Sequence, residues 1–212
     1  MTCTICRERR GRRFCPGVRG DICTLCCGTE REVTVDCPLD CEFLHQARRH
    51  DKPVTLDPER IPNRDIRVTN AVLDEHPQLL SFLGRTLLRA AMSTAGSVDL
   101  DVREALEALI RTYRTLESGV YYETVPSNLL AANIYRFVQQ SLDEFRRNES
   151  ERFGVSRTRD ALVLACLLFY QRRELGQHNG RPRCRVFLSD LLGFYGEAVP
   201  SPSRGTSSLI LP

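Results

Sequence analysis

We expect neither an export signal nor a membrane-spanning helix from this sequence. Its first residues, MTCTICRERRGRR, have no apolar run of the kind that forms the core of a signal peptide. The longest apolar run, ALVLACLLFY at residues 161–170, is too short to cross a bilayer as a helix. We therefore expect a cytoplasmic protein with no membrane partner. Thiols stay reduced in the cytoplasm, so clustered cysteines there are more often metal ligands than disulfides.

Catalytic motifs are missing as well. The chain has no P-loop, no G-x-S-x-G nucleophile turn, no H-E-x-x-H pair and no dinucleotide fingerprint. The four histidines are scattered, and His76 and His178 fall at the ends of predicted helices. The sequence therefore favours a protein that is not an enzyme, although a site assembled only in the folded chain stays open.

Lysine is almost absent, since Lys52 is the single lysine among 30 basic residues. We interpret this skew as the base composition of the source genome, as in a GC-rich bacterium. Because of this skew, an arginine at any one position is weak evidence for a functional role. The net charge of +3 excludes no class of partner.

Cysteine is abundant and unevenly placed. Eight of the 10 cysteines lie in the first 41 residues, and the two later ones, Cys166 and Cys184, are expected to pack in a core. The pattern predicts a small cysteine module at residues 1–50, whose folding depends on bound metal because so short a segment buries little apolar surface.

The rest of the chain divides by composition. Residues 51–68 are rich in proline and charge and are predicted to be a linker that lies over the surface. Residues 69–196 form the predicted helical domain, and the Pro- and Ser-rich residues 197–212 a flexible tail.

The helical domain is predicted to be an all-α bundle of about five helices, because apolar residues recur at intervals of three and four. Pro77, Asp99 or Asp101, and Ser127 mark the starts of the first three. The predicted segments are 74–92, 99–119, 126–145, 156–176 and 181–196. The fourth is apolar on all sides and is therefore expected at the centre.

The strongest motif consists of two C-x2-C pairs, with sixteen residues between the first pair and the second. Two residues between cysteines allow a tight turn to direct both sulfurs at one ion, and a second pair completes a tetrahedron with Zn–S distances of about 2.3 Å. The spacing predicts a first zinc ion bound by Cys3, Cys6, Cys23 and Cys26. An iron–sulfur cluster is the less simple alternative, and a catalytic zinc is disfavoured because such sites keep an open position.

A second zinc ion is expected from the four remaining cysteines of the module, which are Cys15, Cys27, Cys37 and Cys41. The segment from Cys37 is predicted to start a helix, with Pro38 in its first turn. This helix would place Cys37, Cys41 and His45 along one stripe.

Five candidates therefore compete for four positions, and the last ligand is either Cys27 or His45. In the first case Cys26 completes the first site, adjacent Cys27 turns toward the second, and Gly28 lets the chain reverse. In the second case Cys27 is a spare thiol.

The interleaved order of these ligands resembles the cross-brace of RING, B-box and HIT-type zinc fingers. The residues that carry the resemblance are Cys3, Cys6, Cys15, Cys23, Cys26, Cys37 and Cys41. The chain departs from those modules in offering Cys15 alone where they have a pair, and in spacing Cys37 and Cys41 by three residues. The resemblance implies two zinc ions and a function through protein contacts, and a RING-like module would recruit a conjugating enzyme through Ile5.

Arginines are dense in the first cysteine loops, at Arg7, Arg9, Arg10, Arg12, Arg13 and Arg19. A basic loop on a zinc finger is typical of phosphate contacts, so nucleic-acid binding is one hypothesis. These arginines could instead offset thiolate charge, and few aromatic residues accompany them for base stacking. A second basic stretch, residues 172–185, is predicted to be a solvated surface. The preferred hypothesis is a zinc-binding, non-enzymatic adaptor or regulatory protein with a protein partner.

Overall fold

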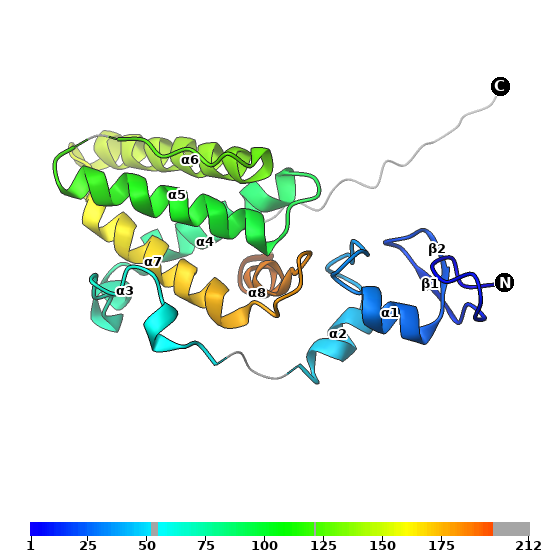
Figure 1. Cartoon of the computed structure of the whole chain (residues 1–212). Helices are drawn as coiled ribbons and strands as arrows, with labels where there is room; N and C mark the ends of the chain where they lie inside the picture. The colour runs from blue at the N-terminus through cyan, green and yellow to red at the C-terminus, as the bar shows by residue number, and fades with distance from the viewer. Residues whose placement is uncertain (52–54, 121, 197–212) are drawn as a thin grey trace, which may run out of the picture.

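The computed structural model describes residues 1–51, 55–120 and 122–196. Within these residues the fold is mostly helical, with eight α-helices and one two-stranded sheet (Figure 1). Buried side chains form two separate clusters, one lined by cysteines in the N-terminal part and one among the later helices. The expected N-terminal cysteine cluster and mostly helical fold are present. No helix among the described residues is both long enough and apolar enough to cross a membrane.

The N-terminal part is built from short elements around its cysteines. Strands β1 and β2 pair antiparallel, with Cys15 opposite Gly20. Two short helices follow the sheet, and Cys23 caps the first of them. The bounds are β1 Arg13–Cys15, β2 Gly20–Ile22, α1 Thr24–Glu30 and α2 Glu42–Arg48.

The helical part places its longer helices side by side. Helix α5 packs against α6 and α7, and α4 packs against α6 and α8. The short helix α3 lies against α7 (Figure 1). The bounds are η1 Pro58–Arg60 (a 3-10 turn), α3 Asn70–Glu75, α4 Pro77–Ser93, α5 Asp99–Glu117, α6 Leu129–Phe153, α7 Asp160–Gln177 and α8 Val186–Tyr195.

The five predicted helices correspond to α4–α8, but eight occur in the part of the chain that the structure describes. The additional helices are α1 and α3, together with α2, which lies within the helix that was predicted separately to start at Cys37. Each is about two turns long, too short to display a full repeat of apolar positions. Helix α6 starts one residue later than predicted, because Asn128 rather than Ser127 accepts the hydrogen bond from the N–H of Leu130, at 3.0 Å.

Close packing of α4 against α7 and α8 depends on Gly84. A Cβ atom at this position would lie 2.3 Å from the Tyr170 hydroxyl and 2.3 Å from the Tyr195 ring. The Tyr170 hydroxyl donates to the carbonyl of Leu80 at 2.7 Å. A larger residue at 84 would therefore separate the three helices. Cys166 lies buried in this core, as predicted.

The described part of the predicted linker runs along the helical domain. Asn63 donates to Gln171 at 3.1 Å, and Arg172 donates to the carbonyl of Ile66 at 3.0 Å. Ile66 and Val68 pack against the helical core. The domain boundaries stay a prediction, and residues 197–212, the predicted tail, lie outside the described residues.

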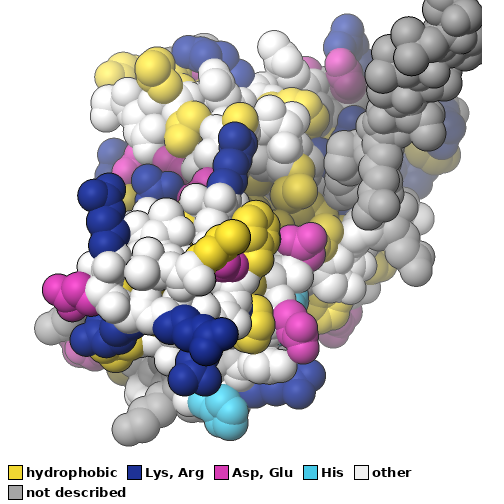
Figure 2. All heavy atoms as spheres, turned by 90° about the vertical axis from the view of Figure 1, so that its right-hand side faces the viewer, with side chains coloured by type: hydrophobic (Ala, Val, Ile, Leu, Met, Phe, Trp, Pro, Cys, Tyr) yellow, Lys and Arg dark blue, Asp and Glu magenta, His cyan; other side chains and the backbone are white. Residues whose placement is uncertain are grey.

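The face of the molecule that carries the cysteine module bears charges of both signs (Figure 2). Basic side chains on this face are separated by acidic, hydrophobic and neutral ones rather than gathered in one continuous patch. A phosphate backbone would thus meet a mixed surface here.

Candidate metal centre

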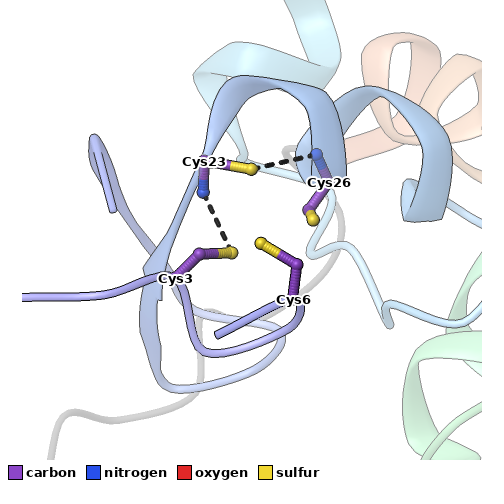
Figure 3. A group of neighbouring side chains, drawn as sticks. All are labelled: Cys3, Cys6, Cys23 and Cys26. Carbon is purple, nitrogen blue, oxygen red and sulfur yellow. Dashed lines mark hydrogen bonds between the residues drawn. The ribbon is translucent and has the colours of Figure 1, made fainter. Parts of the chain in front are cut away.

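The first set of predicted ligands comes together in the structure. The Sγ atoms of Cys3, Cys6, Cys23 and Cys26 all lie within 4.8 Å of one another (Figure 3). Three of these cysteines are buried and Cys6 is half-buried. Sulfurs around a tetrahedral ion with bonds of about 2.3 Å are about 3.8 Å apart. The four thiols are therefore close enough to bind one metal ion.

Two tight turns position these sulfurs. In the first turn, the N–H of Arg7 donates to the carbonyl of Cys3 at 2.8 Å, and Arg7 has a φ of 56°. In the second, the Cys26 N–H donates to the Cys23 sulfur at 3.4 Å, at the start of α1. The N–H of Cys23 reaches across to the Cys3 sulfur at 3.3 Å and joins the two turns (Figure 3).

The thiols of this group differ in how readily they ionise. Burial opposes ionisation of Cys3, but N–H groups of Cys6, Cys23 and Ile5 outweigh it and lower the pKa of Cys3 to about 6. A hydrogen bond with Cys23, followed by burial, raises the pKa of Cys26 to about 12. Four thiolates so close together repel one another, and a divalent cation would remove that repulsion.

Arg9 is exposed on the surface but lies beside this centre. Interaction with the Cys23 sulfur, together with the charge of Cys6, raises the pKa of Arg9. Arg13 lies over the ring of Phe43, with its guanidinium carbon 4.1 Å from the ring centroid. The other predicted nucleic-acid residues are exposed, and these are Arg7, Arg10, Arg12 and Arg19.

The second set of predicted ligands is arranged more loosely. Among the described residues, the first four cysteines form the one group whose ligand atoms all lie within 4.8 Å of one another. The second set, however, shares one cavity of about 210 Å³, lined by Cys15, Cys27, Cys37 and Cys41 together with aromatic and charged neighbours. Burial raises the pKa of the Cys37 thiol, and nearby Cys41 and Cys15 act in the same direction.

The adjacent cysteines of α1 face different sites. Successive side chains of an α-helix are about 100° apart around its axis. Accordingly Cys26 belongs to the first group, whereas Cys27 lines the cavity of the second set. The alternative ligand, His45, is exposed on α2 and is not among the residues that line the cavity.

The predicted helical stripe of Cys37, Cys41 and His45 is wrong. Helix α2 begins at Glu42, and Cys41 is its N-cap. The N–H of Cys41 donates to the carbonyl of Pro38 at 3.2 Å, so residues 38–41 form a turn and not helix. Cys37 therefore reaches the cavity from a segment that is neither helix nor strand.

The predicted chain reversal at Gly28 is also wrong, because Gly28 lies inside α1. The chain turns after the helix, where the carbonyl of Glu30 accepts from the N–H groups of Val33, Thr34 and Val35. Glu32 takes a left-handed conformation in this turn, with φ of 54°.

A close backbone approach brings Cys15 to Cys37. Gly17 follows the strand of Cys15, and a Cβ atom there would lie 2.5 Å from the carbonyl oxygen of Asp36. Real Cβ atoms do not approach a backbone oxygen so closely. Glycine at 17 is therefore required for the two cysteine-bearing segments to meet.

Sequence reasoning missed the acidic residue Glu32. Its side chain is 2% exposed and accepts hydrogen bonds from Arg48 at 2.8 Å, from Asn179 at 2.9 Å and from the N–H of Arg185 at 3.2 Å. The N–H of Arg183 donates to the Glu32 carbonyl at 2.8 Å. No local pattern in the sequence distinguishes Glu32 from the other acidic residues of the module.

The prediction that residues 172–185 are a solvated surface is wrong for the end of that stretch. Residues 178–185 contact residues 31–39 of the cysteine module, and we call these two segments together the junction. Arg181 donates to the carbonyl of Arg31, and Arg185 pairs with Asp36 at 2.5 Å. Cys184 is buried there.

Comparison with known proteins gives no relative for this chain. No protein-family model, no curated protein and no solved structure matches it. The resemblance to RING, B-box and HIT-type modules therefore stays a prediction, and the function must be argued from the centre itself.

Proposed function

We propose that this chain is a structural zinc protein that works as a non-enzymatic adaptor or regulator through protein contacts. The observation that carries the proposal is the group of four sulfurs within 4.8 Å of one another. Four cysteine ligands are typical of structural zinc sites, which are closed and leave no position for a substrate. Soft thiolates also disfavour magnesium and calcium, which prefer oxygen ligands.

The second zinc ion would be bound by Cys15, Cys27, Cys37 and Cys41. Their common cavity supports this set, as does the position of Cys27, which lines the cavity while His45 does not. Binding would draw the four sulfurs inward, because the cavity is larger than one ion needs. The energy of metal binding would then stabilise a segment that lacks a large apolar core of its own.

An adaptor role is supported by the surface of the module. Phe14 is 61% exposed and Leu25 is 53% exposed, beside the two cysteine sites. Exposed aromatic and aliphatic side chains on a rigid support are suited to anchor a protein partner. Two closed zinc sites would make that support rigid without catalysing a reaction.

Elemental analysis of the purified chain tests the metal assignment. We expect about two zinc ions per chain in the wild type, about one in Cys6→Ser, about one in Cys41→Ser, and two in the control Cys166→Ser. Cys166 is an apt control because it is buried in the helical core, away from both sites. A wild type without zinc, or with the absorption of an iron–sulfur cluster, would contradict the proposal.

The adaptor role needs a separate test. A Phe14→Asp/Leu25→Asp double variant should keep two zinc ions, because neither side chain is a proposed ligand. Proteins cross-linked to the wild type in its source cells should be lost from this variant. An unchanged set of cross-linked proteins would show that the exposed apolar residues are not the partner surface.

A further inference from the structure

We infer that metal in the second cysteine site controls the junction, so that binding of this ion attaches the cysteine module to the helical domain. The inference rests on the proposed second site and goes beyond it. It assigns to that site a regulatory role that the first site does not share.

Arg185 is the central residue of the junction. Its Nη1 donates to the carbonyl of Cys37 at 3.1 Å and pairs with Asp36 at 2.5 Å. Its Nε donates to the carbonyl of Ser97, between α4 and α5, at 2.9 Å. One guanidinium, 11% exposed, thus joins a segment that carries a proposed ligand to the helical domain.

Contacts beyond Arg185 continue into the helical core. The N–H of Asp99 donates to the carbonyl of Cys184 at 2.9 Å. The Asp99 carboxylate in turn accepts from the N–H groups of Phe187 and Leu188, at 2.9 and 3.1 Å, at the start of α8. The position of residues 184–185 is therefore coupled to the starts of α5 and α8.

Besides Cys37, a hydrogen-bonded turn at Glu30, the buried side chain of Val35 and the Arg48–Glu32 ion pair support the module's side of the junction. Residues 31–37 contain no helix or strand, and Glu32 has a left-handed backbone that costs a non-glycine residue about 1 kcal/mol or more. The contacts across the junction are mostly hydrogen bonds and ion pairs, with Leu39 as an apolar contribution. Polar contacts between domains are weak enough to open when one side loses its conformation.

Metal would fix that conformation through Cys37. A bound ion would hold the Cys37 sulfur together with sulfurs from β1, α1 and the N-cap of α2, and so fix the carbonyl that Arg185 contacts. Without the ion, only side-chain packing in the cysteine cluster and the chain itself hold Cys37 near the other three ligands. The first site has no such route, because none of its four cysteines belongs to residues 31–39.

Hydrogen exchange of the full chain, loaded with zinc, tests this inference. The probes are the N–H groups of Arg183 and Arg185, which donate to Glu32. We expect Cys41→Ser to exchange about tenfold faster than wild type at both positions. Amides in the middle of α6 should be unchanged, which verifies that the helical domain stays folded. Cys6→Ser, which affects the first site, should leave Arg183 and Arg185 at the wild-type rate.

A second variant approaches the coupling from the opposite side. Coupling between two sites is reciprocal, so breaking the junction must lower the affinity of the second site for zinc. Glu32→Ala should bind two zinc ions, but equilibrium competition with a chelator should show that one of them is bound with about tenfold lower affinity than in wild type. The affinity for the other ion should be unchanged.

The outcomes separate the two proposals. A wild type that binds a single zinc ion overturns the second site and this inference together. A wild type with two ions, combined with unchanged exchange in Cys41→Ser, overturns the inference alone. Equal acceleration by Cys6→Ser would also overturn it, since the effect would not be specific to the second site.

Discussion

The Nη1 atom of Arg185 lies 3.1 Å from the backbone carbonyl oxygen of Cys37, although the two residues are 148 positions apart in the chain. Cys37 is a proposed metal ligand, and Arg185 immediately precedes α8 of the helical domain. The two parts of the molecule thus meet at a residue that the proposed second metal ion would bind. The cysteine module is joined to the helical domain by more than a linker.

Glu32→Ala should destabilise the chain by about 3 kcal/mol, the typical cost of removing one partner of a buried ion pair. The change leaves Arg48, whose side chain is 13% exposed, without its carboxylate, and leaves Asn179 without an acceptor. Urea unfolding of the zinc-loaded protein measures the loss. The control Glu59→Ala removes an 81% exposed carboxylate paired with Arg64 and should change stability by no more than about 0.5 kcal/mol. Equal losses of unfolding free energy in the two variants would contradict a stabilising role of the buried Glu32 side chain.

The first group of four cysteines could be predicted from the sequence because the spacing within each C-x2-C pair is a local signal. A C-x2-C pair determines the geometry of its own turn, so two such pairs predict four converging sulfurs wherever the chain lets them meet. The five long helices were predictable for the same reason, since apolar periodicity over several turns is itself a local signal. The sequence left two roles open for Cys27, and its place in the lining of the second cavity came from the structure.

The junction could not be predicted, because its partners are distant in the sequence. Asn179 lies 147 residues from Glu32, and no composition or spacing relates the two. The helical stripe from Cys37 to His45 was wrong for a different reason. Proline is compatible with both the first turn of a helix and an isolated turn, and only the folded chain shows that Pro38 belongs to the latter.

Gly17→Ala should weaken the second metal site and spare the first. The added Cβ atom would meet the Asp36 carbonyl, which is backbone and cannot rotate away, so the segments of Cys15 and Cys37 would separate. We expect about one zinc ion per chain after dialysis against a weak chelator. Gly28→Ala is the matched control, because nothing lies within 4 Å of its added Cβ atom. That variant should keep both ions and gain about 0.5–1 kcal/mol from the better helix propensity of alanine. Retention of both ions by Gly17→Ala would contradict the proposed geometry.

Arg9→Ala should lower the affinity of the first site for zinc by about tenfold, as removal of a residue that contacts metal ligands commonly does. The guanidinium of Arg9 interacts with the Cys23 sulfur and so stabilises negative charge on it. Competition with a coloured chelator measures the affinity. Arg10→Ala, at an exposed neighbouring position, should bind zinc as the wild type does. If both variants bind with wild-type affinity, Arg9 has no part in the metal centre.

Asp99→Asn should remove a pH dependence of stability that originates in the helical domain. Burial raises the pKa of Asp99 from 3.8 to about 6, assisted by the charge of Glu174 and opposed by hydrogen bonds from Phe187, Leu188 and Cys184. Because the pKa is higher in the folded chain, the folded chain binds the proton more tightly than the unfolded chain. This contribution to stability is complete below about pH 4 and is lost as the pH rises through 6.

Between pH 5 and pH 8 the wild type should therefore lose about 1 kcal/mol of unfolding free energy that Asp99→Asn does not lose. Urea unfolding at several pH values, with zinc present throughout, measures both chains. The pH dependence of the zinc sites is common to the two and cancels in the difference. Asp65→Asn, which alters a 60% exposed carboxylate, should follow the wild type. If wild type and Asp99→Asn lose stability in parallel, the Asp99 carboxyl is already ionised at pH 5, and burial does not dominate its environment.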